Sequence, residues 1–307
     1  MSLAPSARPS HQAETVLTDG THLAVRHTLA SAPGLPPAVY VHGLGGSSHN
    51  WTDLAEALRG LVDGMAVDLP GFGASPPPAG GDYSIDAHTQ AVAGLIEHLG
   101  AGPVHLFGNS MGGAVSTRLA ATRPDLVRTL TLISPALPDL RPRPTVAPVA
   151  LLALPGVAGL LTRQTADRPA EEHVRNFLRL AYADPARIPE ERFLESVEGY
   201  RQRQALPYAQ QALVQSARGL VREYLSRSPE QLWRQAARVQ APTLLVYGRH
   251  DKLVDPRMAH KAVGTFPDVR LLTLPDSGHV AMMEHTAEVA QAFRALLREM
   301  ESAKAVA

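Results

Sequence analysis

The most informative absences in this 307-residue sequence are those of cysteine, net charge and long hydrophobic runs. Without cysteine, the chain can form no disulfide, no thiolate nucleophile and no cysteine-ligated metal site. Lys+Arg and Asp+Glu each total 29, so the chain has no net charge that would attract nucleic acid or an anionic membrane. Nucleic-acid binding is therefore not expected.

Membrane insertion and secretion are also disfavoured by the sequence. Residues 1–10 contain no apolar run long enough for a signal-peptide core. The longest apolar segment, 146–161, is interrupted by Pro148 and Pro155 and is shorter than the ~20 residues that cross a bilayer. We therefore expect a cytoplasmic protein with a disordered leader over residues 1–13 and no stable membrane insertion. The composition leaves formation of a homodimer open.

Short apolar runs alternate with helix-like segments in the first 135 residues and again after residue 240. Such alternation is typical of an α/β protein with a parallel sheet and helices on both faces. Residues 136–240 instead begin with a proline-rich stretch and continue as helix-like sequence with no convincing strand. We predict an α/β core from residues 14–135 and 241–307, ending in an amphipathic helix over 284–299, with a helical insertion over 136–240.

The segment Gly108-Asn-Ser-Met-Gly112 lies between a β-like run and a helix-like run. A glycine two residues before and two residues after a serine is the pattern of a nucleophile elbow, a strained turn that exposes the serine hydroxyl. Glycine tolerates the unusual dihedral angles and the close backbone approach that such a turn needs. The pattern therefore identifies Ser110 as a candidate nucleophile.

A serine hydroxyl becomes a nucleophile only with a base in hydrogen-bond reach, itself oriented by a third group. Asp251 closely follows the strand predicted over 242–247, and His279 closely follows the strand predicted over 269–274. The carboxyl ends of parallel strands meet at one edge of the sheet, where open α/β proteins build their sites. We therefore expect Asp251 and His279 to meet Ser110 there.

Two other acids are candidates for orienting His279. Asp255 precedes Pro256 and fits a helix cap better, whereas Asp276 is too close to His279 along the chain to orient its ring easily. Asp251 is therefore the preferred acid.

The oxyanion of a tetrahedral intermediate requires preorganised hydrogen-bond donors. The backbone N–H of Met111 is one candidate, and the loop after the predicted strand 38–42, Gly43-Leu44-Gly45, should supply a second, preferably from Leu44. His42 is expected to hold the geometry of this loop without titrating during the reaction. Nothing in this set of residues calls for a metal or a cofactor.

Together these motifs resemble the capped members of the α/β-hydrolase superfamily. The resemblance rests on five segments in the same order, which are His42-Gly43, residues 68–75, Gly108-Asn-Ser-Met-Gly112, Gly248-Arg-His-Asp251 and Gly278-His279. It implies the α/β-hydrolase fold, an eight-stranded and mostly parallel sheet with a helical cap inserted after the sixth strand. It also implies a cofactor-free serine hydrolase with a catalytic triad, in which Ser110 attacks a carbonyl, His279 transfers protons and Asp251 orients the imidazole.

The leading functional hypothesis is a carboxylesterase or lipase-like enzyme acting on small-molecule esters with fairly apolar acyl groups. Leucines at the start of the insertion could line an apolar cleft, as expected for apolar ligands, or equally form the core of the cap. The candidate substrate-binding residues are Gly43, Leu151, Leu154, Leu160 and Val280. Thioester, lactone and amide hydrolysis stay open.

Hydrolases that cleave C–C bonds of meta-cleavage products (2-hydroxy-6-oxo-dienoates) are the main alternative, since they are similar in the Ser-Met-Gly-Gly elbow and the final Gly-His. They usually carry tryptophan after the catalytic histidine, where this chain has Val280, and an arginine in the cap, for which Arg163, Arg175 and Arg179 are candidates. Ser110 argues against epoxide hydrolases and haloalkane dehalogenases, which use a carboxylate nucleophile. A non-enzymatic ligand-binding protein of the same fold is the third alternative.

Overall fold

A computed structural model describes residues 11–18, 21–139, 141, 143–154, 168–228 and 230–306. Its strands form an eight-stranded sheet in the order β1-β2-β4-β3-β5-β6-β7-β8. They are β1 (His11–Thr18), β2 (Thr21–Thr28), β3 (Pro37–Val41), β4 (Asp63–Val67), β5 (Val104–Asn109), β6 (Val127–Ile133), β7 (Thr243–Gly248) and β8 (Val269–Leu274). The pairs β1–β2 and β2–β4 are antiparallel and the other five pairs are parallel. The predicted α/β class and mostly parallel sheet are confirmed.

The first strand begins earlier than the sequence predicts. His11 pairs with Thr28 and Ala13 pairs with Arg26 in the antiparallel register, so residues 11–13 belong to β1 and not to a leader. The sequence pattern does not indicate a strand here, because an edge strand is held by backbone hydrogen bonds and needs few large apolar side chains. Residues 1–10 of the predicted leader lie outside the described residues.

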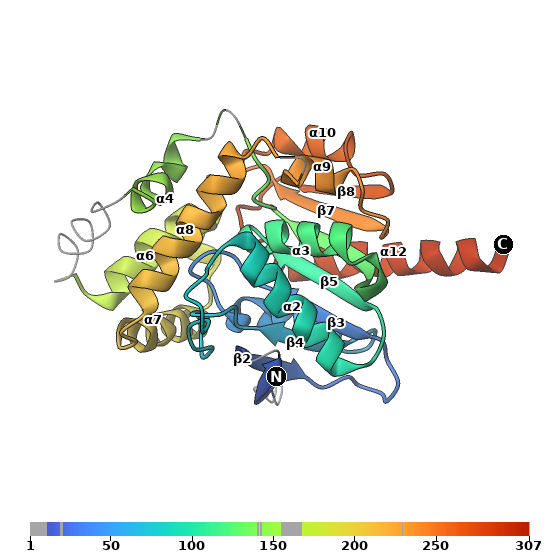
Figure 1. Cartoon of the computed structure of the whole chain (residues 1–307), viewed down its shortest axis with the longest axis horizontal. Helices are drawn as coiled ribbons and strands as arrows, with labels where there is room; N and C mark the ends of the chain where they lie inside the picture. Colours follow the sequence, from blue (N-terminus) through green and yellow to red (C-terminus); the bar gives the residue numbers. More distant parts are fainter. Residues whose placement is uncertain are drawn as a thin grey trace, which may run out of the picture.

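The central strands are covered on both faces, which explains why they read as continuous apolar runs. On β3, Val39 and Val41 point into one core, whereas Ala38 and Tyr40 point into the other. The helices that contribute to the first core are α2 (Ile85–Leu99), α3 (Met111–Thr122), α8 (Ala209–Leu225), α9 (Leu232–Ala236) and α10 (Met258–Val263). Those that contribute to the second are α1 (Thr52–Leu58), α6 (Ala170–Ala181), α7 (Glu190–Gln204), α11 (Ala281–Glu284) and α12 (Thr286–Val306). In Figure 1, α2 and α3 lie in front of the sheet.

The described residues between β6 and β7 form helices and no strand. These are α4 (Ala147–Leu152), α6 (Ala170–Ala181), α7 (Glu190–Gln204), α8 (Ala209–Leu225) and α9, with the 3₁₀ turns η3 (Pro144–Val146) and η4 (Pro185–Arg187). Two further 3₁₀ turns, η1 (Ser48–Trp51) and η2 (Pro124–Leu126), lie in the rest of the chain. Helices α4, α6, α7 and α8 gather at one end of the molecule, away from the projecting end of α12 (Figure 1). Among the described residues no helix is long and apolar enough to cross a bilayer.

Arg118 on α3 attaches these helices to the core. Its side chain is buried, its Nε donates to Gln235 Oε1 at 3.1 Å, and its Nη2 donates to Glu223 Oε2 at 2.8 Å. Its Nη1 also lies 3.0 Å from Asp86 Oδ1 on α2. A buried guanidinium needs several acceptors to offset its desolvation, and these come from α2, α8 and α9. Arg118 therefore fixes α8 and α9 relative to the helix that follows Ser110.

Two histidines of the core are buried in a way that disfavours protonation. His88 on α2 hydrogen-bonds through Nε2 to Ser216 Oγ on α8 at 3.1 Å, and burial lowers its pKa to about 3. His105 on β5 bonds to Thr129 Oγ1 at 2.8 Å, and burial, followed by the charge of Arg128, lowers its pKa to about 4. Both imidazoles are therefore neutral in the folded protein at neutral pH.

We expect acid to destabilise the protein through these histidines. Their folded pKa values lie below the unfolded value of about 6.5, so the unfolded chain binds more protons between about pH 6.5 and about pH 4. The free energy of unfolding should fall over that range by about 1.4 kcal/mol per pH unit for each histidine. Urea unfolding at several pH values measures how steeply the free energy of unfolding depends on pH. This dependence should be weaker in His88→Gln than in the wild type. It should be unchanged in His98→Gln, a substitution at an exposed residue of the same helix. Equal slopes in both variants would contradict this account.

Candidate active site

Ser110 sits at the sharp turn between β5 and α3. Its backbone has φ 53° and ψ −117°, in a region that L-residues rarely adopt. A Cβ at Gly108 would lie 2.5 Å from the carbonyl oxygen of Gly112, and a Cβ at Gly112 would lie 2.2 Å from that of Val41. These glycines therefore let strand and helix approach as the motif predicts, and the strained turn places Ser110 at the edge of the sheet.

The strand-end loops bring Asp251 and His279 together. His279 Nδ1 lies 2.9 Å from Asp251 Oδ2, and both side chains are buried. The other carboxylate oxygen, Oδ1, accepts the N–H groups of Leu253 and Val254 at 2.8 and 2.9 Å. Burial alone would raise the pKa of Asp251, but the charge and hydrogen bond of His279 and the Val254 amide outweigh it, so the pKa is lowered.

The ionised carboxylate decides which nitrogen of His279 carries the proton. A carboxylate can only accept, so Nδ1 donates to Asp251 and Nε2 keeps its lone pair. The competing acids are engaged elsewhere. Asp255 accepts the Arg257 N–H at 3.0 Å, and Asp276 pairs with Arg187 at 3.1 Å.

Asn109, directly before the serine, connects the base to the nucleophile strand. Its Nδ2 donates to the backbone carbonyl of His279 at 3.1 Å and to that of Ile133 at 3.0 Å. The side chain is buried, so these two bonds satisfy both amide protons away from water. Asn109 therefore fixes the backbone of the base loop beside Ser110, a role that the sequence analysis did not identify.

The loop after β3 packs directly against Ser110. A Cβ at Gly43 would lie 3.0 Å from Ser110 Cβ, so any larger residue would press on the serine. Met111 begins α3, and its N–H therefore has no intrahelical acceptor. No described residue accepts a hydrogen bond from the Leu44 N–H either. Met111 thus directly follows the serine in sequence, and Leu44 directly follows Gly43, which packs against the serine.

His42 holds this loop as a neutral ring. Its Nδ1 donates to the carbonyl of Gly43 at 2.7 Å, and its Nε2 accepts the Leu69 N–H at 3.0 Å. Burial lowers the pKa of His42, although the nearby charge of Asp68 opposes the shift. The neutral imidazole uses both nitrogens, which is the structural arrangement expected for His42 from the sequence.

The candidate substrate-binding residues differ from one another in burial. The side chains of Leu151 and Leu154 are 42% and 49% exposed, so they form apolar surface on and just after α4. Val280 is buried among the core residues packed near α12. Leu160 lies outside the described residues, as does Arg163.

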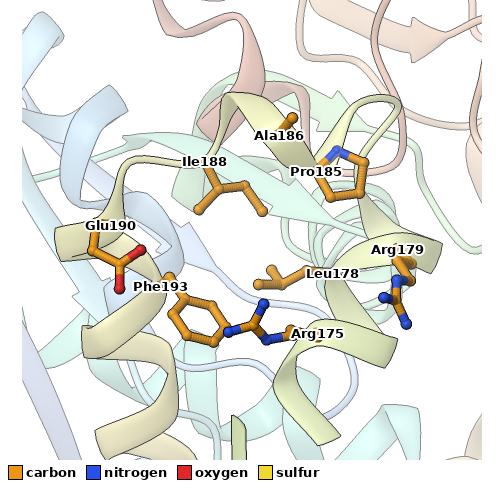
Figure 2. Close-up of a pocket in the computed structure, with 8 residues that line it drawn as sticks. All are labelled: Arg175, Leu178, Arg179, Pro185, Ala186, Ile188, Glu190 and Phe193. Atoms are coloured by element: carbon orange, nitrogen blue, oxygen red, sulfur yellow. The ribbon is translucent and has the colours of Figure 1, made fainter. Parts of the chain in front are cut away.

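The other two candidate cap arginines lie on α6. Arg175 and Arg179 line a cavity of about 250 Å³ formed by α6, η4 and α7. Leu178, Ile188 and Phe193 surround this cavity (Figure 2), and the guanidinium of Arg175 lies 4.8 Å from the ring centroid of Phe193. None of the lining residues is one of the predicted catalytic or oxyanion residues. The guanidinium of Arg179 donates to Asn176 Oδ1 on the same helix at 3.0 Å.

Across the described ranges, no group of three or more histidine, aspartate or glutamate side chains is arranged to hold a metal ion. The polar groups described above pair instead with one another or with the backbone.

Comparison with known proteins identifies the family. A family model described as alpha/beta hydrolase fold matches residues 36–286, which is more than half of the chain. The chain therefore belongs to the α/β-hydrolase family, and it is a hydrolase.

Its relatives within the family have diverse activities. The dihydrolipoyllysine-residue acetyltransferase component of the acetoin cleaving system of Pseudomonas putida is 30% identical over 272 residues, which are 87% of this chain and 64% of that protein. The chain thus spans just under two thirds of that relative. Lipase 1 of Psychrobacter immobilis is 27% identical over 273 residues, covering 85% of this chain and 77% of the lipase.

A 2-hydroxy-6-oxononadienedioate/2-hydroxy-6-oxononatrienedioate hydrolase of Burkholderia vietnamiensis is 26% identical over 280 residues, covering 88% of this chain and 89% of that enzyme. Among solved structures, a bacterial membrane phospholipase A superposes with a TM-score of 0.78 at 23% identity, covering 95% of this chain and 87% of that one. At that identity, the likeness shows the shared fold alone.

Proposed function

We propose that this chain is a serine hydrolase that cleaves carboxylic esters of fairly apolar acyl groups through an acyl-enzyme on Ser110. The observation that carries the proposal is the buried 2.9 Å contact between His279 and Asp251, on a loop tied by Asn109 to the strained turn of Ser110. A buried imidazole with a fixed tautomer, on a loop hydrogen-bonded to the residue before a strained and partly exposed serine, has a ready explanation in nucleophilic catalysis.

In the proposed mechanism, Ser110 Oγ attacks the ester carbonyl carbon and its proton passes to His279 Nε2. The oxyanion that forms accepts hydrogen bonds from the N–H groups of Leu44 and Met111, each worth about 10²–10³ in rate in comparable sites. His279 then donates its proton to the departing alkoxide. Water, deprotonated by the same nitrogen, attacks the acyl carbon. The bond from that carbon to Ser110 Oγ then breaks, His279 returns its proton to Oγ, and the carboxylic acid is released.

We propose that the helical segment over residues 136–240 acts as a cap above this site. The support is that its helices reach the catalytic loops. Arg203 of α7 donates to the carbonyl of Gly45, and the carbonyl of Ala181 at the end of α6 accepts the His279 N–H at 2.7 Å. The exposed Leu151 and Leu154 of the same segment offer apolar surface for an acyl chain.

The hypothesis of ester hydrolysis is tested by labelling with a fluorophosphonate probe and by kinetics with a series of p-nitrophenyl esters. We expect the probe to label Ser110, because only an activated serine reacts. From acetate to hexanoate, kcat/KM should rise by up to about fourfold per methylene, the equivalent of burying about 0.8 kcal/mol per CH₂. No labelling together with no ester turnover would favour a non-enzymatic ligand-binding protein.

Hydrolysis of a C–C bond in a 2-hydroxy-6-oxo-dienoate is the second candidate. The observation that favours it is the likeness to the Burkholderia vietnamiensis hydrolase along most of both chains. Val280 at the position after His279 counts against it, as do the contacts of the Arg175 guanidinium with Phe193 and of the Arg179 guanidinium with Asn176. A ring-cleaved dienoate turned over with a higher kcat/KM than the best ester would replace the first candidate by the second.

A further inference from the structure

The loop that carries His279 is pressed onto the end of helix α6. The His279 N–H donates to the carbonyl of Ala181 at 2.7 Å. A Cβ at Gly278 would lie 2.5 Å from that same carbonyl oxygen and 2.6 Å from the nitrogen of Ala183. The backbone of the base loop therefore touches the backbone of residues 181–183 with no side chain between them.

Glu284 ties the same two segments together from the other side. Its Oε1 accepts the Gly278 N–H at 2.8 Å, and its Oε2 accepts the Ala183 N–H at 2.8 Å. The carboxylate is half-buried, and no arginine or lysine among the described residues forms an ion pair with it. Burial raises its pKa, and the two amides oppose that shift. Glu284 is thus held by one main-chain amide from each segment, and the Ser277 hydroxyl also lies 3.5 Å from Oε1.

The acid loop is attached to the same helix end. Lys252, the residue after Asp251, donates from Nζ to the carbonyl of Arg179 at 2.6 Å and to that of Tyr182 at 3.4 Å. An ammonium at the last turn of a helix interacts favourably with its free carbonyl groups. Residues 179–183 are therefore a common anchor for the loops that carry the acid and the base.

We propose that Glu284 is a positioning residue, which sets the place of the His279 imidazole by joining Gly278 to Ala183. This inference rests on the proposed function for its effect on rate. A carboxylate suits the role because each of its two oxygens accepts an N–H without a donor of its own. A primary amide of the same shape accepts with one atom only, and its NH₂ group would face the other backbone N–H. A misplacement of about 1 Å in a catalytic group can cost about 10² in rate.

The test is the variant Glu284→Gln, with Glu288→Gln as its matched control. Glu288 lies one turn further along, is exposed, and contacts His285 at 3.5 Å. We expect Glu284→Gln to lower kcat by about 10- to 100-fold with KM changed less than about twofold, since only the base moves. The rate of fluorophosphonate labelling should fall by the same factor, and Glu288→Gln should match the wild type. Unchanged kcat in a folded Glu284→Gln protein would overturn the proposal.

Two measurements that need no turnover separate this proposal from the proposed function. Hydrogen exchange of the Gly278 and His279 amides should be at least about tenfold faster in Glu284→Gln, because one anchor is lost. The proton NMR signal of His279 Nδ1–H, held by Asp251, should broaden or shift. If both changes occur in a protein that hydrolyses no ester, the positioning of His279 by Glu284 stands and the proposed function fails. If neither occurs, the positioning role is wrong whether or not the wild type is active.

Discussion

Replacement of Ser110 by alanine should lower kcat for a short-chain p-nitrophenyl ester by about 10⁴-fold or more. Only the hydroxyl group is removed, and in the proposed mechanism its oxygen forms the bond to the acyl group. Oxyanion donors and binding would remain, so a small residual rate above that in water is expected. His279→Ala should lower kcat to a similar level, because in the proposed mechanism His279 Nε2 accepts the serine proton. Steady-state kinetics and loss of fluorophosphonate labelling measure the effect.

The stability of Ser110→Ala should change little. Alanine at φ 53° is strained as serine is, and the Ser110 hydroxyl makes no hydrogen bond to another described residue. Ser116→Ala is the matched control, since Ser116 lies on the same helix, is fully buried and has no described hydrogen-bond partner for its hydroxyl. It should keep activity within a few-fold. A folded Ser110→Ala protein with more than a tenth of wild-type activity would refute the nucleophile assignment.

The parts of the site that the sequence predicts are those whose signals are local. The elbow is encoded within five residues, and its glycines are required by contacts of 2.2–2.5 Å that a Cβ would make. Asp251 and His279 could be selected because both come shortly after strands, and parallel strands end at one edge of the sheet. The register of β6, β7 and β8 then sets their loops side by side. That step follows from topology alone and needs no knowledge of side-chain packing.

The parts that the sequence does not predict depend on long-range contacts. Asn109 donates a hydrogen bond to the carbonyl of His279, 170 residues away in sequence, and Glu284 accepts one from the Ala183 N–H, 101 residues away. Neither position carries a local pattern that distinguishes it from an ordinary polar residue. The sequence predicts only that a closing helix starts at residue 284, whereas α11 ends at Glu284 and α12 begins at Thr286. The break between these helices is what turns Glu284 toward Gly278.

The helices between β6 and β7 contact the catalytic loops through groups that their amino-acid composition does not indicate. Leucines suggest an apolar lid, and Leu213 of α8 does approach Gly45. Backbone carbonyl groups at the end of α6 and Arg203 of α7 add polar contacts with the catalytic loops. Arg203 has a pKa lowered by burial, and its charge opposes protonation of His42 beneath the oxyanion loop. These helices therefore contact the loops on which catalysis is proposed to depend.

Asp251→Asn should lower kcat by about 10⁴-fold while leaving the fold intact, an effect known for the wrong tautomer of a catalytic histidine. In Asp251, Oδ1 accepts two backbone N–H groups and Oδ2 accepts from His279. In the variant the amide oxygen would keep the two backbone bonds, because the NH₂ group cannot accept them. The NH₂ would then face His279 Nδ1, which could only accept, and the imidazole proton would move to Nε2.

A histidine protonated on Nε2 and not on Nδ1 has no lone pair directed at Ser110, so the serine keeps its proton and the acyl-enzyme forms slowly. KM should change little, since Asp251 is buried beneath the imidazole and does not face the substrate. Steady-state kinetics would measure this loss, with Asp255→Asn as the control, because Asp255 caps a turn and pairs with Arg143 at 3.5 Å. A loss of less than about tenfold in Asp251→Asn would mean that some other group fixes the tautomer of His279.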